Sequence, residues 1–136
     1  MTRAEEPGLA LLRLLAGTAR GPRRDAAFAL WLTARVAEDM MTASDLSERA
    51  QRRRVAALEK RVSSLSLPPS FRRALTAGLA QMRDPRPEAA QGALTQLAAP
   101  VGDTLGPEAA GAIQRLVRGV KLSTVVSRPS TVDSQG

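Results

Sequence analysis

The residue types that most often do chemistry in proteins are missing from this chain of 136 residues. It contains no histidine, no cysteine and no tyrosine. Those side chains supply most general bases near neutral pH, most nucleophiles other than serine, and most ligands of transition metals. A serine nucleophile would lack a histidine base, and no glycine-rich phosphate loop follows a strand. We therefore expect a protein that binds a partner, is not an enzyme, and needs no cofactor or metal.

The acidic side chains that come closest to a catalytic or metal-binding group are Asp39, Asp45 and Glu48. Paired carboxylates transfer protons or bind a hard cation when they converge on one point. Asp45 and Glu48, however, have the spacing of a helix capping box. Arg49 and Arg52 follow them at four residues, which is the spacing of ordinary helical ion pairs. We interpret the three carboxylates as structural.

The strongest functional signal is the basic run QRRRVAALEKR at residues 51–61. Four of its cations have no carboxylate four residues away and are predicted to be free to contact phosphates or an acidic protein, namely Arg53, Arg54, Lys60 and Arg61. No aromatic residue lies within the run to stack on bases, and bundle helices normally expose charge. The candidate contact residues for a protein or nucleic-acid partner are Arg49, Arg52, Arg53, Arg54, Lys60, Arg61, Arg72 and Arg73.

The net charge of +7 is concentrated in the middle of the chain. Residues 43–85 carry nine basic and four acidic side chains, against six and five in residues 1–42 and five and four in residues 86–136. Such an excess favours an acidic partner or nucleic acid. No segment has the ~20 mostly apolar residues of a membrane span, and the first residues lack the pattern of a secretory or transit peptide. We expect an intracellular protein without a membrane partner.

The elements that must position these cations are helices. Hydrophobic residues make up 43% of the chain but aromatic residues only 2%, so the core must consist mainly of aliphatic side chains, and its Ala and Leu favour close-packed helices. Proline, glycine and apolar periodicity predict helices over residues 7–19, 23–42, 45–65, 69–83, 87–99 and 107–121, with no strand before residue 120. The predicted fold is an all-α bundle of five helices plus an N-terminal helix. Its domain covers residues 1–122, and residues 123–136 form a flexible tail.

The apolar positions predict which faces are buried. Residues 45–65 have a narrow seam consisting of Val55, Leu58, Val62 and Leu65. Residues 23–42 have two stripes, one with Phe28, Trp31, Leu32, Val36 and Met40, the other with Leu30, Ala34, Ala37 and Met41. A helix that is apolar on two sides is predicted to lie at the centre of a bundle, and Trp31 is expected in the core.

Several short segments follow a familiar order. A basic pair at residues 53–54 precedes LSLP at 65–68, EAA at 88–90 leads to Leu97, and AIQRLV follows at 112–117. In this order they resemble the small α-helical domain shared by the steroid receptor RNA activator protein and the C-terminus of the COPII outer-coat subunit. The resemblance covers residues 23–122 and implies a helical interaction domain without catalysis. Members of that family act as a transcriptional coregulator or as part of a vesicle coat, so membership of the family would not fix one role.

These observations predict a non-enzymatic α-helical protein-interaction module, either an adaptor or a subunit of a larger complex. The alternative is a basic helical protein that binds the RNA or DNA backbone through residues 49–61. A membrane-surface helix at residues 7–19 is a weaker alternative because its flanks are acidic. The sequence does not identify the partner or the oligomeric state. Salt-dependent retention on a polyanion distinguishes the first two predictions.

Overall fold

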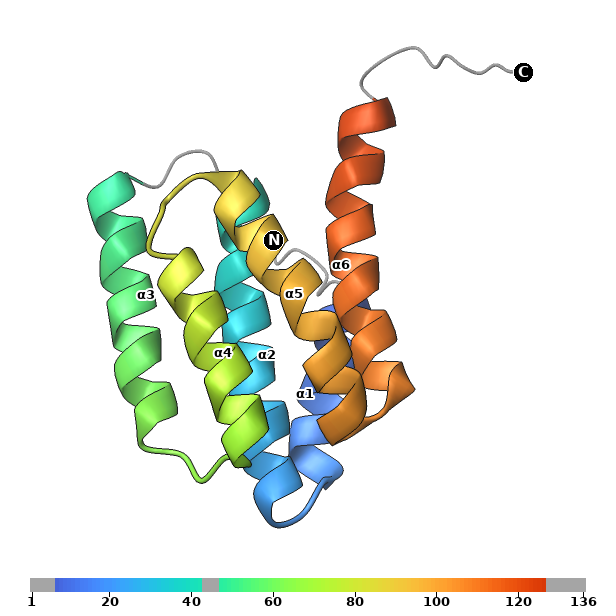
Figure 1. Cartoon of the computed structure of the whole chain (residues 1–136). Coiled ribbons are helices and arrows are strands. Elements are labelled where there is room, and N and C mark those ends of the chain that lie inside the picture. Colours follow the sequence, from blue (N-terminus) through green and yellow to red (C-terminus); the bar gives the residue numbers. More distant parts are fainter. Residues whose placement is uncertain (1–6, 43–46, 127–136) are drawn as a thin grey trace.

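A computed structural model describes residues 7–42 and 47–126, with side chains up to Arg118 except those of Pro7 and Pro22. No strand occurs in these ranges, which confirms the predicted all-α bundle. The helices, drawn in Figure 1, are α1 (Pro7–Thr18), α2 (Pro22–Thr42), α3 (Glu48–Ser63), α4 (Pro69–Gln81), α5 (Pro87–Leu105) and α6 (Pro107–Val126).

Helix α2 is the central element, as its two apolar stripes predict. It contacts each of the other five helices, and α5 packs beside it against α4 and α6. Helix α3 contacts only α2 and α4 and lies at the edge of the bundle (Figure 1). The basic helix therefore has a wide face that no other described helix covers.

The start of α3 differs from its predicted position. The helix begins at Glu48, and Ser47 caps it by accepting a hydrogen bond from the backbone N–H of Ala50 at 3.1 Å. Ser47 is therefore the N-cap in place of the predicted Asp45. Serine caps a helix as well as aspartate does. Asp45 itself lies outside the described residues. Val55, Leu58 and Val62 of the predicted seam are buried, whereas Leu65 is only partly buried and lies beyond the end of the helix at Ser63.

Helix α5 continues through Pro100 to Leu105, so the predicted end at residue 99 and the loop over residues 100–106 are wrong. Proline inside a helix removes one backbone hydrogen bond and crowds the preceding turn. Val101 and Leu105, both buried, lie beyond it, and burial of their side chains offsets that cost. The last helical residue is Leu105. Gly106 follows it with a φ of 103°, which suits glycine, and turns the chain into α6.

Helix α6 is longer than predicted. It extends to Val126, past the predicted end at residue 121 and into the segment predicted as a tail. Residues 127–136, the remainder of that segment, lie outside the described residues.

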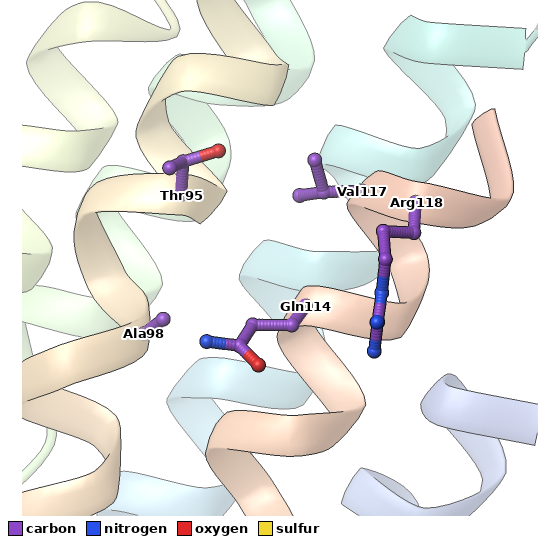
Figure 2. A pocket seen from close by; sticks show the side chains of 5 residues that line it. All are labelled: Thr95, Ala98, Gln114, Val117 and Arg118. Atoms are coloured by element: carbon purple, nitrogen blue, oxygen red, sulfur yellow. The ribbon is translucent and has the colours of Figure 1, made fainter. Parts of the chain in front are cut away.

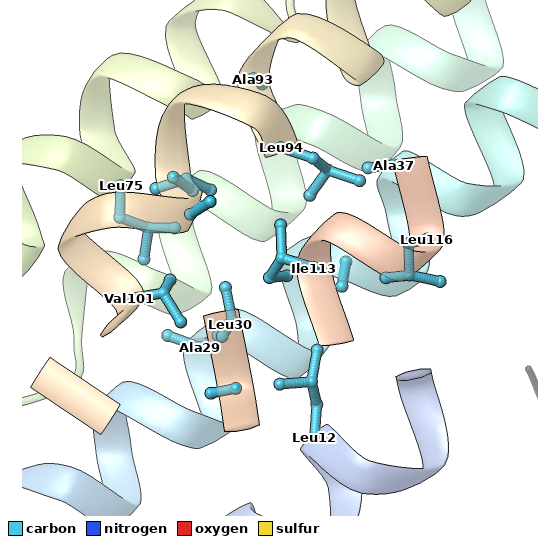
Figure 3. Packing of buried hydrophobic residues seen from close by; sticks show 14 of the residues in the cluster. Leu12, Ala29, Leu30, Ala37, Leu75, Ala93, Leu94, Val101, Ile113 and Leu116 are labelled. Atoms are coloured by element: carbon cyan, nitrogen blue, oxygen red, sulfur yellow. The ribbon is translucent and has the colours of Figure 1, made fainter. Parts of the chain in front are cut away.

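The core lies between α2, α5 and the helices around them. Figure 3 shows Leu12, Leu30, Leu94 and Ile113, which come from four different helices, among its residues. On α2 the second predicted stripe is the more deeply buried, with Leu30, Ala34 and Ala37 fully covered. Small side chains on this face let neighbouring helices approach closely.

The larger residues of α2 are less buried than predicted. Trp31, Leu32 and Val36 are only partly buried and pack against the edge of the core, and Phe28 is also partly buried. The expectation that Trp31 lies in the core is therefore wrong. The indole ring lies at the border of the bundle instead, where one side contacts the core.

Candidate interaction surface

Three cations on α3 form a row that points away from the bundle. Arg49, Arg53 and Lys60 are exposed, and none of them has an ion pair with a carboxylate in the described part of the chain. A helix turns 100° per residue, so these three positions fall within about 40° of one another on the side opposite the buried seam. We call Arg49, Arg53 and Lys60 the outer row.

Two other predicted cations face α2 instead. The Nη2 of Arg54 donates to Oδ2 of Asp39 at 2.8 Å, and both side chains are about one-third exposed. The guanidinium of Arg61 lies over the ring of Phe28, with its central carbon 5.4 Å from the ring centroid. The expectation that Arg54 is free is therefore wrong. Its partner is on another helix, which a search four residues along the same helix does not reach.

The remaining candidates are divided between local contacts and solvent. Arg52 is 3.9 Å from Glu48 in an exposed pair, and such pairs contribute little. The Nη2 of Arg72 donates to the backbone oxygen of Leu65 and links α4 to the end of α3. Arg73 is exposed on α4. These residues do not extend the outer row.

The structure adds two aromatic residues that sequence reasoning did not connect with the basic helix. The ring centroids of Phe28 and Trp31 are 6.1 Å apart. The guanidinium carbon of Arg35 is 5.0 Å from the Trp31 centroid, on the same helix. Together with Arg61 these residues form a layer of two rings and two guanidinium groups across α2 and α3. We call Phe28, Trp31, Arg35 and Arg61 the aromatic–arginine cluster.

Part of this cluster could have been found from spacing. Phe28, Trp31 and Arg35 stand three and four residues apart, which places them on one face of a helix. The contribution of Arg61 requires the pairing of α2 with α3, which no local pattern contains. The indole Nε1 of Trp31 is buried and has no hydrogen-bond acceptor among the described residues.

The surface over α2 and α3 carries uncompensated positive charge. Three carboxylates of these helices already have partners, because Asp39 pairs with Arg54, Glu59 pairs with Arg83 at 2.8 Å, and Asp25 accepts a hydrogen bond from the backbone N–H of Ser66. By contrast, Arg35, Arg61 and the outer row have no described carboxylate partner. Such a surface attracts negatively charged groups.

The perturbed titrating groups lie elsewhere, in the turn between α4 and α5. Hydrogen bonds from the side chain and backbone of Arg86 lower the pKa of Asp84, and the same side-chain hydrogen bond raises the pKa of Arg86. The two side chains lie 2.7 Å apart and close this turn. This is a structural pair, since nothing converges on it.

Two shallow hollows occur away from this surface. One, of about 310 Å³, lies between α5 and α6, where Figure 2 shows Thr95 and Ala98 opposite Gln114 and Val117. The other follows α1 beside Leu14, which is 61% exposed. The described residues that line these two hollows include no carboxylate.

Within the described ranges, no group of three or more acidic side chains is placed to hold a metal ion. None of the helices described combines the length and apolarity needed to cross a membrane. Comparison of the chain with protein-family models, with curated proteins and with solved structures gives no match.

Proposed function

We propose that this chain is a non-enzymatic α-helical interaction module, an adaptor or subunit of a larger complex, that binds a protein partner over α2 and α3. The observation that carries the proposal is the aromatic–arginine cluster. Tryptophan and arginine are the residues most enriched among those that dominate protein–protein binding energy. Arginine and aromatic residues are also enriched across interfaces, whereas lysine is depleted.

Composition and resemblance support the same proposal. The chain lacks histidine, cysteine and tyrosine, and 18 of its 20 basic residues are arginine. The resemblance to the helical domain of the RNA activator protein and the vesicle-coat subunit, which remains a prediction, also implies an interaction role.

Quantitative capture from an extract of the source cells tests the proposal, with two arginine variants compared. Arg35→Glu reverses a charge within the cluster, and Arg115→Glu makes the same change at an exposed position of α6. We expect the unmodified chain and the Arg115→Glu variant to retain one protein in stoichiometric amount, and the Arg35→Glu variant to lose it. Equal retention of that protein by all three chains would contradict the proposed surface.

Nucleic-acid binding is the second candidate, and the outer row is the observation that favours it. Arg49, Arg53 and Lys60 are exposed on one side of α3 without a described carboxylate partner. Such cations neutralise phosphates, so the logarithm of the binding constant should fall with the logarithm of salt by about 0.9 per phosphate on duplex DNA. Fluorescence anisotropy with labelled duplex DNA tests this. The result that would favour nucleic acid over protein is a salt dependence with a slope of several units. The double variant Arg53→Glu with Lys60→Glu should then abolish that dependence.

A further inference from the structure

The two guanidinium groups of the aromatic–arginine cluster are held in place but leave their hydrogen-bonding capacity unused. Arg35 lies over Trp31 and Arg61 lies over Phe28, at 5.0 and 5.4 Å from the ring centroids. A cation–π contact of this kind does not use the five N–H donors of a guanidinium as hydrogen bonds to a carboxylate. Neither side chain makes an ion pair with a described carboxylate.

An acidic residue four positions from Arg35 already has another partner. Asp39, on the same helix, is already bound to Arg54 at 2.8 Å. Arg35 and Arg61 are both exposed, and their guanidinium groups have no carboxylate partner among the described residues. A planar guanidinium matches a carboxylate in a bidentate pair. Because the rings restrict the rotamers of both arginines, less side-chain entropy is lost when such a pair forms.

We infer that Arg35 and Arg61 are a paired carboxylate receptor, and that the partner contributes an acidic protein segment lying across α2 and α3. This inference rests on the proposed function and specifies the chemistry of its partner. The charge of the surface supports a segment with several carboxylates rather than a single one. Next to the receptor, the outer row adds three exposed cations without described acidic partners, which attract further negative groups over a distance of about 10 Å.

The cluster favours carboxylates over nucleic-acid bases. Base binding to a single strand depends on free aromatic faces on which the bases stack. Here a guanidinium covers each ring, and both rings are partly buried. The groups offered to a ligand are consequently N–H donors. Phosphates also accept from such donors, so an experiment must separate carboxylates from phosphates.

Titration with two simple polyanions tests the inference. Poly-L-glutamate supplies carboxylates and an oligothymidylate supplies phosphates with bases. Trp31 is the only tryptophan of the chain, so its fluorescence reports directly on the cluster. We expect poly-L-glutamate to bind the full chain and to change the emission of Trp31 as Arg35 engages a carboxylate. Oligothymidylate should bind more weakly.

Two matched double variants separate the receptor from general charge. Arg35→Lys with Arg61→Lys keeps both charges but removes the planar fork, and should weaken poly-L-glutamate binding about tenfold. Arg49→Lys with Arg53→Lys makes the same change in the outer row and should alter binding by no more than about twofold. If the first variant unfolds, Arg35→Lys alone serves, because Arg35 is exposed and contacts a ring of its own helix.

Three results would overturn the inference: no binding of poly-L-glutamate, equal effects of the two double variants, or tighter binding of oligothymidylate with quenching of Trp31. The last would identify the cluster as a nucleic-acid surface. Each is separate from a failure of the proposed function. If cell-extract capture of a protein still depends on Arg35, the interaction module stands and only the carboxylate receptor is rejected.

Discussion

Matched charge reversals on α3 distinguish cations that hold the helix to the bundle from those that face solvent. One variant changes the inward pair, Arg54→Glu with Arg61→Glu. The other changes two residues of the outer row, Arg53→Glu with Lys60→Glu. Both alter the net charge equally, and each puts one glutamate in the middle of the helix and one in its last turn. Propensity and helix-dipole effects are therefore similar, and a difference in stability reports the contacts with α2.

The contacts with α2 predict the size of that difference. The Arg54–Asp39 pair, at 2.8 Å and about one-third exposed on both sides, is worth about 0.5–1 kcal/mol. Reversal also places two carboxylates side by side, at a similar cost. Loss of Arg61 from the ring of Phe28 removes about 0.5–1 kcal/mol. We expect the inward variant to lose about 1.5–3 kcal/mol of unfolding free energy, and the outer variant no more than about 0.5 kcal/mol.

Urea unfolding followed by far-UV circular dichroism and by Trp31 fluorescence measures both values. In thermal unfolding the inward variant should melt about 5–10 °C below the unmodified chain, and the outer variant within about 2 °C of it. Equal losses in the two variants would refute the assignment of Arg54 and Arg61 to the α2–α3 contact. They would also mean that α3 is oriented differently around its own axis.

Three further results are expected. Gly78→Ala should stabilise the chain by about 0.5–1 kcal/mol in urea unfolding, because the added Cβ would lie 3.6 Å from Leu97 in ordinary contact inside α4. Leu94→Ala should cost about 2–5 kcal/mol in the same assay, since this side chain is fully buried. The pKa of Asp84, followed by NMR, should lie below the ordinary value of an aspartate and rise in Arg86→Ala, because Arg86 donates hydrogen bonds to this carboxylate. The lowered pKa stabilises the fold at pH values above the ordinary pKa of an aspartate. This contribution disappears as the pH falls through the lowered pKa of Asp84.

Most helix positions could be predicted because proline marks their first turns. Pro7, Pro69, Pro87 and Pro107 each begin a helix in the structure, as the sequence indicates. The same rule failed at Pro100, inside α5. A proline terminates a helix only when nothing outweighs its lost hydrogen bond, and here buried side chains follow it in the same helix. The positions of proline and glycine in the sequence do not show how deeply the following side chains are buried.

The burial of α2 shows a second limit of sequence patterns. The sequence predicts both stripes and places Trp31 in the core. In the structure Ala34 and Ala37 are fully covered and Trp31 is at the edge. Hydrophobicity indicates that a face is buried but not which neighbour covers it. Small residues let helices approach closely, and the larger Phe28 and Trp31 lie at the edge of the core instead.

The candidate surface depends on tertiary pairing more than on any motif. Spacing alone brings Phe28, Trp31 and Arg35 together on α2, whereas Arg61 joins them only because α3 packs alongside. The same packing gives adjacent residues of the basic run opposite roles, since Arg54 binds Asp39 while Arg53 faces solvent. Charge reversal of the whole run would therefore mix a loss of stability with a loss of binding. Only substitutions chosen by helix face can assign a function to this helix.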